Sequence, residues 1–224
     1  MLSPAFAERP GALCGLCQRL HPPFERAVAY GSCDGGLRDL IHLLKYQQVR
    51  PASAVLGRMV GESVAAFETS LPEGAIQVVP VPLHPRKQAQ RGFNQADLIS
   101  RVALQQLARP DRFQLRTGVL VRQRETGSQI GLTRHQRREN LRGAFAVIDP
   151  TQLAHRNVLL VDDVFATGTT ASECARVLRR AGAARVWVVT VARTLKTDEG
   201  FAMRDDFWKK ESNSEDSPAM VASG

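Results

Sequence analysis

Two adjacent carboxylates followed by a hydroxyl-rich turn are the residues of this sequence best suited to chemistry. The pair and the turn are Asp162, Asp163, Ala166, Thr167, Gly168, Thr169 and Thr170. A glycine that allows close backbone approach, threonine hydroxyls and the free N–H groups of a helix start together favour a phosphate. An ionised carboxylate only accepts hydrogen bonds, so the acids suit the vicinal hydroxyls of a ribose. The segment therefore predicts a sugar-phosphate site, with the phosphate in the turn and the diol on the acids.

The elements around this segment place it at the edge of a sheet. The continuous apolar run 157–161 predicts a strand buried on both faces, and 170–181 predicts a helix ended by Gly182. In an open α/β sheet, ligands bind beyond the carboxyl ends of the strands. A purely structural alternative is that the acids and threonines only cap the helix. The sequence contains neither G-x-x-x-x-G-K-[ST] nor G-x-G-x-x-G, which disfavours a nucleoside-triphosphatase or dinucleotide site.

Strands and helices alternate along most of the chain. Leu37, Leu40, Ile41 and Leu44 follow the spacing of an amphipathic helix, and further helices are expected after Pro51 and over 96–108. The other expected strands are 77–82, 118–122, 144–148 and 185–192. This alternation predicts an α/β fold with a parallel, Rossmann-like sheet flanked by helices.

The net charge of +8 over 224 residues is unevenly distributed. Residues 84–142 contain 13 basic and 4 acidic residues, a net of +9, whereas 196–224 contain 4 basic and 7 acidic residues, a net of −3. A basic block of this kind predicts an anionic partner, either nucleic acid or a small polyphosphate.

The remaining composition indicates a cytoplasmic protein. No apolar run approaches the roughly 18 residues of a membrane helix, so no membrane insertion is expected. The N-terminus does not read as a signal peptide, and the 4 cysteines are too few for a disulfide framework. The polar tail 196–224 is expected to be disordered.

The segment 158–170, with four apolar residues, two acids and a Thr-Gly-Thr-Thr turn, resembles the ribose-5-phosphate signature of type I phosphoribosyltransferases. Three further segments resemble the ComF family of competence-associated proteins within that superfamily. They are LRDLIHLLKY (37–46), VPVPLHPR with QRGFNQ (79–95), and a pattern of Arg, Thr, Gln, Asn and Gly residues over 122–145. Together these segments place the resemblance over residues 13–195.

This resemblance implies a phosphoribosyltransferase fold with a small hood, which binds phosphoribosyl pyrophosphate together with Mg²⁺. It places a pyrophosphate loop at 82–91, with the cations Arg86, Lys87 and Arg91. It places the hood at 122–142, with Arg134, Arg137 and Arg138, although that run is equally suited to an exposed amphipathic helix. Asn94 and Gln95 either bind substrate or cap the following helix.

Cys14 and Cys17 have the spacing of a zinc knuckle, but a structural zinc needs four ligands. The family usually carries paired knuckles, and here His21 and Cys33 are the nearby residues that would have to complete the Zn²⁺ site. The expected organisation is an N-terminal segment over 1–30, a phosphoribosyltransferase-like domain over 31–195 and the tail from 196.

Two functions of different class remain open. One is the transfer of phosphoribose to an acceptor that the sequence does not identify. The other is a non-catalytic accessory of natural transformation that handles single-stranded DNA, alone or with other proteins of the competence machinery. An aromatic content of 6% offers few platforms for base stacking, which weakens the second hypothesis.

Overall fold

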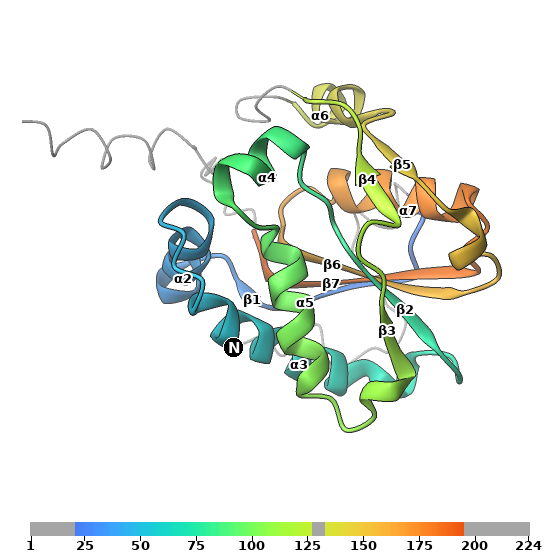
Figure 1. Cartoon of the computed structure of the whole chain (residues 1–224), viewed down its shortest axis with the longest axis horizontal. Helices are drawn as coiled ribbons and strands as arrows, with labels where there is room; N and C mark the ends of the chain where they lie inside the picture. The colour runs from blue at the N-terminus through green and yellow to red at the C-terminus, as the bar shows by residue number, and fades with distance from the viewer. Residues whose placement is uncertain (1–20, 127–132, 195–224) are drawn as a thin grey trace, which may run out of the picture.

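A computed structural model of the chain describes residues 21–126 and 133–194. Its centre is a five-stranded, fully parallel sheet in the order β1-β7-β6-β2-β3 (Figure 1). The strands of this sheet are β1 (Arg26–Ser32), β2 (Ile76–Pro80), β3 (Phe113–Leu115), β6 (Asn157–Phe165) and β7 (Arg185–Arg193). The α/β class with a parallel sheet, predicted from the sequence, is confirmed.

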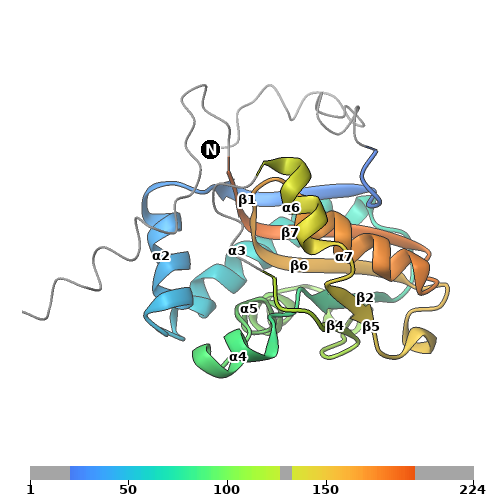
Figure 2. The same ribbon diagram turned by 90° about the horizontal axis from the view of Figure 1, so that it is seen from above.

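Helices cover both faces of the sheet. They are α2 (Gly35–Tyr46), α3 (Ala52–Phe67), α4 (Pro85–Arg91), α5 (Gln95–Gln105), α6 (Arg134–Leu141) and α7 (Thr169–Arg180), with short 3-10 turns η2 (Glu68–Ser70), η3 (Pro110–Arg112) and η4 (Pro150–Gln152). The helices α3 and α5 lie on one face and α7 on the other, which Figures 1 and 2 show from two directions. Each face therefore buries its own apolar cluster against β6 and β7.

The central strands β6 and β7 form because their residues are mostly apolar and rich in valine, as a strand buried on both faces requires. Side chains of a strand alternate between its faces. Val158 and Leu160 accordingly pack on the α7 side, while Leu159 and Val161 pack on the α3 and α5 side. This alternation fixes which face each of the following two residues, the acids, can reach.

A small antiparallel pair, β4 (Leu120–Arg122) and β5 (Phe145–Val147), stands on either side of α6 in the chain; from here on we call the described residues 120–126 and 133–147 the hood. Arg124 closes the base of the hood by donating to the backbone carbonyls of Asn140 at 2.7 Å and Arg142 at 2.8 Å. The backbone N–H of Gly143 donates to Glu173 Oε1 on α7 at 2.9 Å, so the hood is anchored to the helix beside the site.

Three local expectations need correction. The strand expected at 157–161 continues to Phe165, because its pairing with β7 extends through Asp162 opposite Thr190. The loop expected at 82–91 contains α4, whose Pro85 begins the helix and whose Gly92 ends it in a left-handed conformation. The strand β1 begins at Arg26, within the range 1–30 that was expected to form a separate segment, because it pairs with β7.

The tail 196–224 lies outside the described residues. Within the ranges that are described, none of the helices combines the length and the apolar character needed to cross a membrane. Cys33 is a partly buried free thiol, and Cys174 is a fully buried one on α7.

Candidate sugar-phosphate site

The turn between β6 and α7 is built as the sequence predicts. Gly168 takes a left-handed conformation, with φ of 72°, immediately before the first residue of α7. The hydroxyls of Thr167 and Thr169 are hydrogen-bonded to each other at 2.8 Å. The first backbone N–H groups of a helix have no partner within the helix, and the helix dipole is positive there. This turn therefore offers donors and positive potential to an anion.

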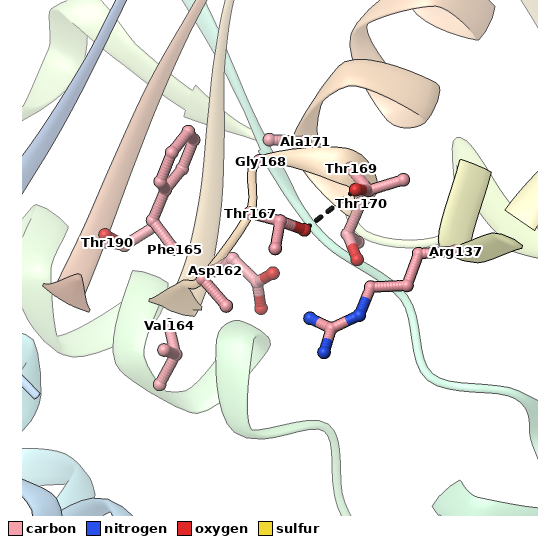
Figure 3. A pocket seen from close by; sticks show the side chains of 11 residues that line it. Arg137, Asp162, Val164, Phe165, Thr167, Gly168, Thr169, Thr170, Ala171 and Thr190 are labelled. Carbon is pink, nitrogen blue, oxygen red and sulfur yellow. Dashed lines mark hydrogen bonds between the residues drawn. The ribbon is translucent and has the colours of Figure 1, made fainter. Parts of the chain in front are cut away.

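A small pocket of about 50 Å³ lies against this turn. It is lined by Arg137, Asp162, Val164, Phe165, Ala166, Thr167, Gly168, Thr169, Thr170, Ala171 and Thr190. Figure 3 shows the guanidinium of Arg137, from the hood, pointing into the space between Asp162 and the threonines of the turn. The structure thus brings together one acid, the whole predicted turn and one hood arginine.

The side chains of the two adjacent acids lie in different surroundings. Asp162 lies in the pocket, whereas Asp163 is 4% exposed and does not line it. Asp163 Oδ1 lies 2.8 Å from Nζ of Lys45, in the last turn of α2. The backbone N–H of Asp163 donates to Asp162 Oδ1 at 2.9 Å, so the adjacent residues also meet through the main chain. Both acids were predicted to face a sugar, but the structure places Asp162 in the pocket and Asp163 against Lys45 instead.

Burial and the neighbouring Asp163 raise the pKa of Asp162 to about 7, against an ordinary value of 3.8, although Lys45 and Arg122 partly offset the rise. Burial by itself would lower the pKa of Lys45, but attraction to Asp163 outweighs it, so the pKa of Lys45 lies above its ordinary value. The acid in the pocket therefore titrates near neutrality, while the lysine beside its neighbour stays charged.

Arg122 approaches the site from β4 of the hood. Its guanidinium donates to the hydroxyl of Thr126, lies 5.5 Å from the ring centroid of Phe145, and has a buried Nε with no hydrogen-bond partner among the described residues. Burial lowers its pKa, and Asp162 and Cys174 act in the opposite direction. Arginine remains charged even so, which places a further cation near Asp162, besides Lys45 and Arg137.

The predicted pyrophosphate cations lie on α4, outside the pocket. Arg86 is exposed and pairs with Glu125 at 2.8 Å, and Lys87 is exposed as well. Arg91 donates to Gln95 Oε1 at 3.1 Å and lies 5.4 Å from the ring centroid of Tyr46. Because α4 follows β2, the neighbour of β6, it lies at the same carboxyl edge of the sheet as the pocket.

The other predicted residues have simpler positions. Arg134 is the first residue of α6, and Arg138 is exposed on that helix without lining the pocket. Asn94 caps α5, since its side chain accepts from the N–H of Ala96 at 3.0 Å and donates to the carbonyl of Val81 at 3.0 Å. Gln95 is buried and accepts from Arg91.

Sequence reasoning missed Lys45, Arg122 and Thr190 as site residues. Two of them had a signal: Lys45 lies off the apolar stripe of its helix, and Thr190 interrupts an apolar strand. The register places Thr190 beside Asp162, where its hydroxyl donates to the carbonyl of Ala192 at 3.1 Å. These contacts link distant segments, so spacing along the chain did not reveal them.

The expected zinc knuckle of Cys14 and Cys17 lies outside the described residues. Among the residues that are described, no group of three or more His, Cys, Asp or Glu side chains is arranged to hold a metal ion.

Comparison with known proteins decides the family. The sequence model of the Phosphoribosyl transferase domain matches residues 103–219. The DNA utilization protein YhgH of Salmonella typhi is 36% identical over 191 residues, which cover 84% of this chain and 81% of that protein. Competence protein F of Haemophilus influenzae is 34% identical over 185 residues, 80% of this chain and 78% of that protein. The chain belongs to the ComF-type branch of the phosphoribosyltransferase family.

Solved phosphoribosyltransferases are more distant. The hypoxanthine phosphoribosyl transferase of Trypanosoma cruzi aligns with 73% of this chain and 92% of its own, at 10% identity and a TM-score of 0.40. The family assignment therefore rests on the sequence matches, and the arrangement of the site on this protein's own residues.

Proposed function

We propose that the protein binds phosphoribosyl pyrophosphate, together with Mg²⁺, at the carboxyl edge of its sheet. The observation that carries this proposal is the pocket in which Asp162 faces the N-terminus of α7 and its threonine-rich turn. One end of that pocket suits an anion and the other suits hydroxyl donors, and a sugar phosphate joins both groups in one molecule.

The 5′-phosphate would occupy the turn. Backbone N–H groups at the start of α7 and the hydroxyls of Thr167, Thr169 and Thr170 supply the donors. Arg137 adds a positive charge from the hood, and its guanidinium can donate charge-assisted hydrogen bonds to the phosphate. The phosphate would thereby join the hood to the main sheet.

The ribose hydroxyls would donate to Asp162, and the pyrophosphate would lie toward α4. That helix presents Arg86, Lys87 and Arg91 at the same edge of the sheet. A substrate with phosphates at both ends of a sugar needs two separate basic groups. The turn with Arg137 and the helix α4 provide two such groups at this edge of the sheet.

Mg²⁺ fits this site as a companion of the substrate. The pocket contains one acid, Asp162, and the described residues include no group of three or more metal-ligating side chains. The ion would therefore take few of its ligands from the described part of the protein. Magnesium commonly binds nucleotide and phosphate substrates with water and substrate oxygens as most of its ligands. Bound in that way, it would neutralise charge on the leaving pyrophosphate.

Transfer of phosphoribose to an acceptor extends the proposal from binding to catalysis. Displacement of pyrophosphate at C1 builds positive charge on the sugar ring, and positioning with neutralisation of the leaving group lowers that barrier without a protein nucleophile. The names of the relatives, competence protein F and DNA utilization protein, suggest a role in the uptake or use of DNA.

Isothermal titration calorimetry with phosphoribosyl pyrophosphate and Mg²⁺ tests the proposal. Wild type should bind, and Asp162→Asn should weaken binding by about 10-fold or more, since a buried hydrogen bond to a charged group contributes ~1.5–3 kcal/mol. Asp111→Asn, at an exposed position in η3, is the matched control and should bind like wild type. A wild-type protein that does not bind the ligand would show the proposal to be wrong.

Binding of single-stranded DNA is a second candidate, favoured by one feature of the surface. The ring of Tyr46 is exposed and its centroid lies 5.4 Å from the guanidinium of Arg91, while Arg50 adds a second cation over the buried ring of Phe93, so this basic patch has one exposed aromatic ring. Such patches support base stacking and phosphate contact. Oligonucleotide affinity should then fall steeply with salt. A slope near zero would exclude this role.

A further inference from the structure

We propose that Lys45 is a positioning residue of the sugar site: it holds Asp163 away from the pocket and leaves Asp162 as the acid that contacts the sugar. This assignment rests on the proposed function and gives different roles to two adjacent acids. Asp162 would be a ligand of the substrate, and Asp163 would be one half of a buried ion pair.

The ion pair joins the end of α2 to the end of β6. The side chains of Lys45 and Asp163 are 19% and 6% exposed, and Nζ lies 2.8 Å from Oδ1. The other oxygen of Asp163, Oδ2, is buried without a hydrogen-bond partner among the described residues. A buried carboxylate in this condition depends on its lysine for compensation of charge.

The geometry of the strand separates the acids. Successive residues of β6 point to opposite faces, so Asp162 continues the side of Val158 and Leu160 while Asp163 continues the side of Leu159 and Val161. For Asp163 to reach a ligand in the pocket, it would have to leave Lys45, whose largely buried ammonium group would then lose its ion-pair partner. The same strand therefore offers one acid to the pocket and one to α2.

The ion pair of Lys45 and Asp163 also changes the net charge beside the pocket. Two adjacent carboxylates without a cation would repel each other and would also repel a substrate with phosphates at both ends. Lys45 neutralises one of them from the side opposite the pocket. Asp162 can then ionise and accept from hydroxyls in a site whose local charge still tolerates a polyanion.

A double-mutant cycle at the two partners tests this assignment. We expect Lys45→Met and Asp163→Asn each to weaken the binding of phosphoribosyl pyrophosphate with Mg²⁺ by about tenfold or more. Lys45→Met leaves Asp163 as an uncompensated carboxylate beside Asp162, and Asp163→Asn leaves Lys45 to pair with Asp162 in place of the sugar. The double variant Lys45→Met/Asp163→Asn removes both and keeps Asp162. Its affinity should return to within about threefold of wild type.

The pH dependence of binding separates positioning from a general effect on folding. The charged or titratable groups around Asp162 are Lys45, Arg122, Arg137, Asp163 and Cys174. In Lys45→Met, Asp162 must ionise beside a carboxylate that has lost its cation, so the midpoint of binding should move to higher pH. In the double variant the midpoint should return toward that of wild type. Thermal unfolding of each variant confirms that the proteins compared are folded.

A double variant that binds as weakly as Asp163→Asn would overturn the assignment, since it would mean that Asp163 itself contacts the sugar. Single variants with wild-type affinity and an unmoved pH midpoint would overturn it as well. If wild type itself does not bind, the proposed function fails and this assignment fails with it. That result differs from a wild type that binds beside a double variant that does not.

Discussion

A methyl group on Gly168 would lie 2.7 Å from Cζ of Phe165, the last residue of β6. The ring of Phe165 in turn packs edge-on against Phe24, with ring centroids 6.2 Å apart. The backbone of Gly168 also has a φ of 72°, which side chains rarely adopt. Two constraints therefore require glycine at this position of the turn.

Gly168→Ala should destabilise the protein by about 1–3 kcal/mol and should weaken binding of phosphoribosyl pyrophosphate, because the turn must shift to accommodate the methyl group. Gly74→Ala is the control: its φ is 92°, but nothing lies within 4 Å of the added carbon. The control should cost only the strain of the backbone, about 1 kcal/mol, and should bind normally. Chemical denaturation and calorimetry measure both effects; equal effects of the two variants on binding would contradict the role of Phe165.

Binding should depend on pH near neutrality. The pKa of Asp162 is raised to about 7, so the carboxylate that we propose accepts from ribose hydroxyls becomes populated as pH rises through that value. Affinity for phosphoribosyl pyrophosphate should therefore increase between pH 6 and 8 after correction for ionisation of the ligand itself. In Asp162→Asn the increase should disappear. An unchanged increase in that variant would assign the titration to another group.

The same shift affects stability with the opposite sign. Between its ordinary pKa of 3.8 and about 7, Asp162 holds a proton in the folded state that the unfolded chain has lost. Its contribution to the free energy of unfolding therefore decreases as pH rises across this window. Asp162→Asn should gain more stability relative to wild type at pH 8 than at pH 4.5, as measured by urea denaturation. A gain independent of pH would contradict the raised pKa.

Two adjacent arginines of α6 should behave differently. Arg137 lines the pocket, whereas Arg138 is exposed outside it. We expect Arg137→Met to weaken binding of phosphoribosyl pyrophosphate by about tenfold or more, as the loss of a charge-assisted hydrogen bond does. Arg138→Met should stay close to wild type. Equal losses in calorimetry would indicate that only the general charge of the hood matters.

The anchor between the hood and α7 should control how readily the hood opens. Glu173 is 7% exposed, accepts from the N–H of Gly143 and pairs with Arg176. Glu173→Ala leaves these groups without their acceptor, at a cost of about 1–3 kcal/mol. Hydrogen exchange over 134–147 should become faster than in Glu139→Ala, which removes an exposed pair with Arg142 at 3.9 Å. Identical exchange in the two variants would show that Glu173 does not hold the hood.

The part of the site that could be predicted from sequence is the part that is continuous in sequence. The segment from Asp162 to Thr170 supplies most of the pocket lining, and its residue types and spacing follow from strand, turn and helix rules. Most of the strands and helices were predictable for the same reason: long apolar runs and regular helical spacing are local signals.

The remainder depends on contacts between segments. Whether a residue at the end of a strand faces the pocket or the opposite helix is set by where the strand stops, and β6 continues past its apolar run because β7 pairs with it. The ion pair of Lys45 arises from the packing of α2 against that end. The helix α4 has only seven residues and the edge strand β1 is half exposed, so both give weak local signals.

The link between α2 and β6 also bears on how the protein is made. During synthesis Lys45 is made early and Asp163 late. In the sheet, β6 lies between β2, from the first half of the chain, and β7, at the end of the described residues. The region 103–219, which the family model matches, contains the signature but lacks β1, α2, β2 and α4. We therefore expect a nascent chain to form the pocket beside Asp162 only once β7 is in place, and a fragment cut at the boundary of the family match should not form it.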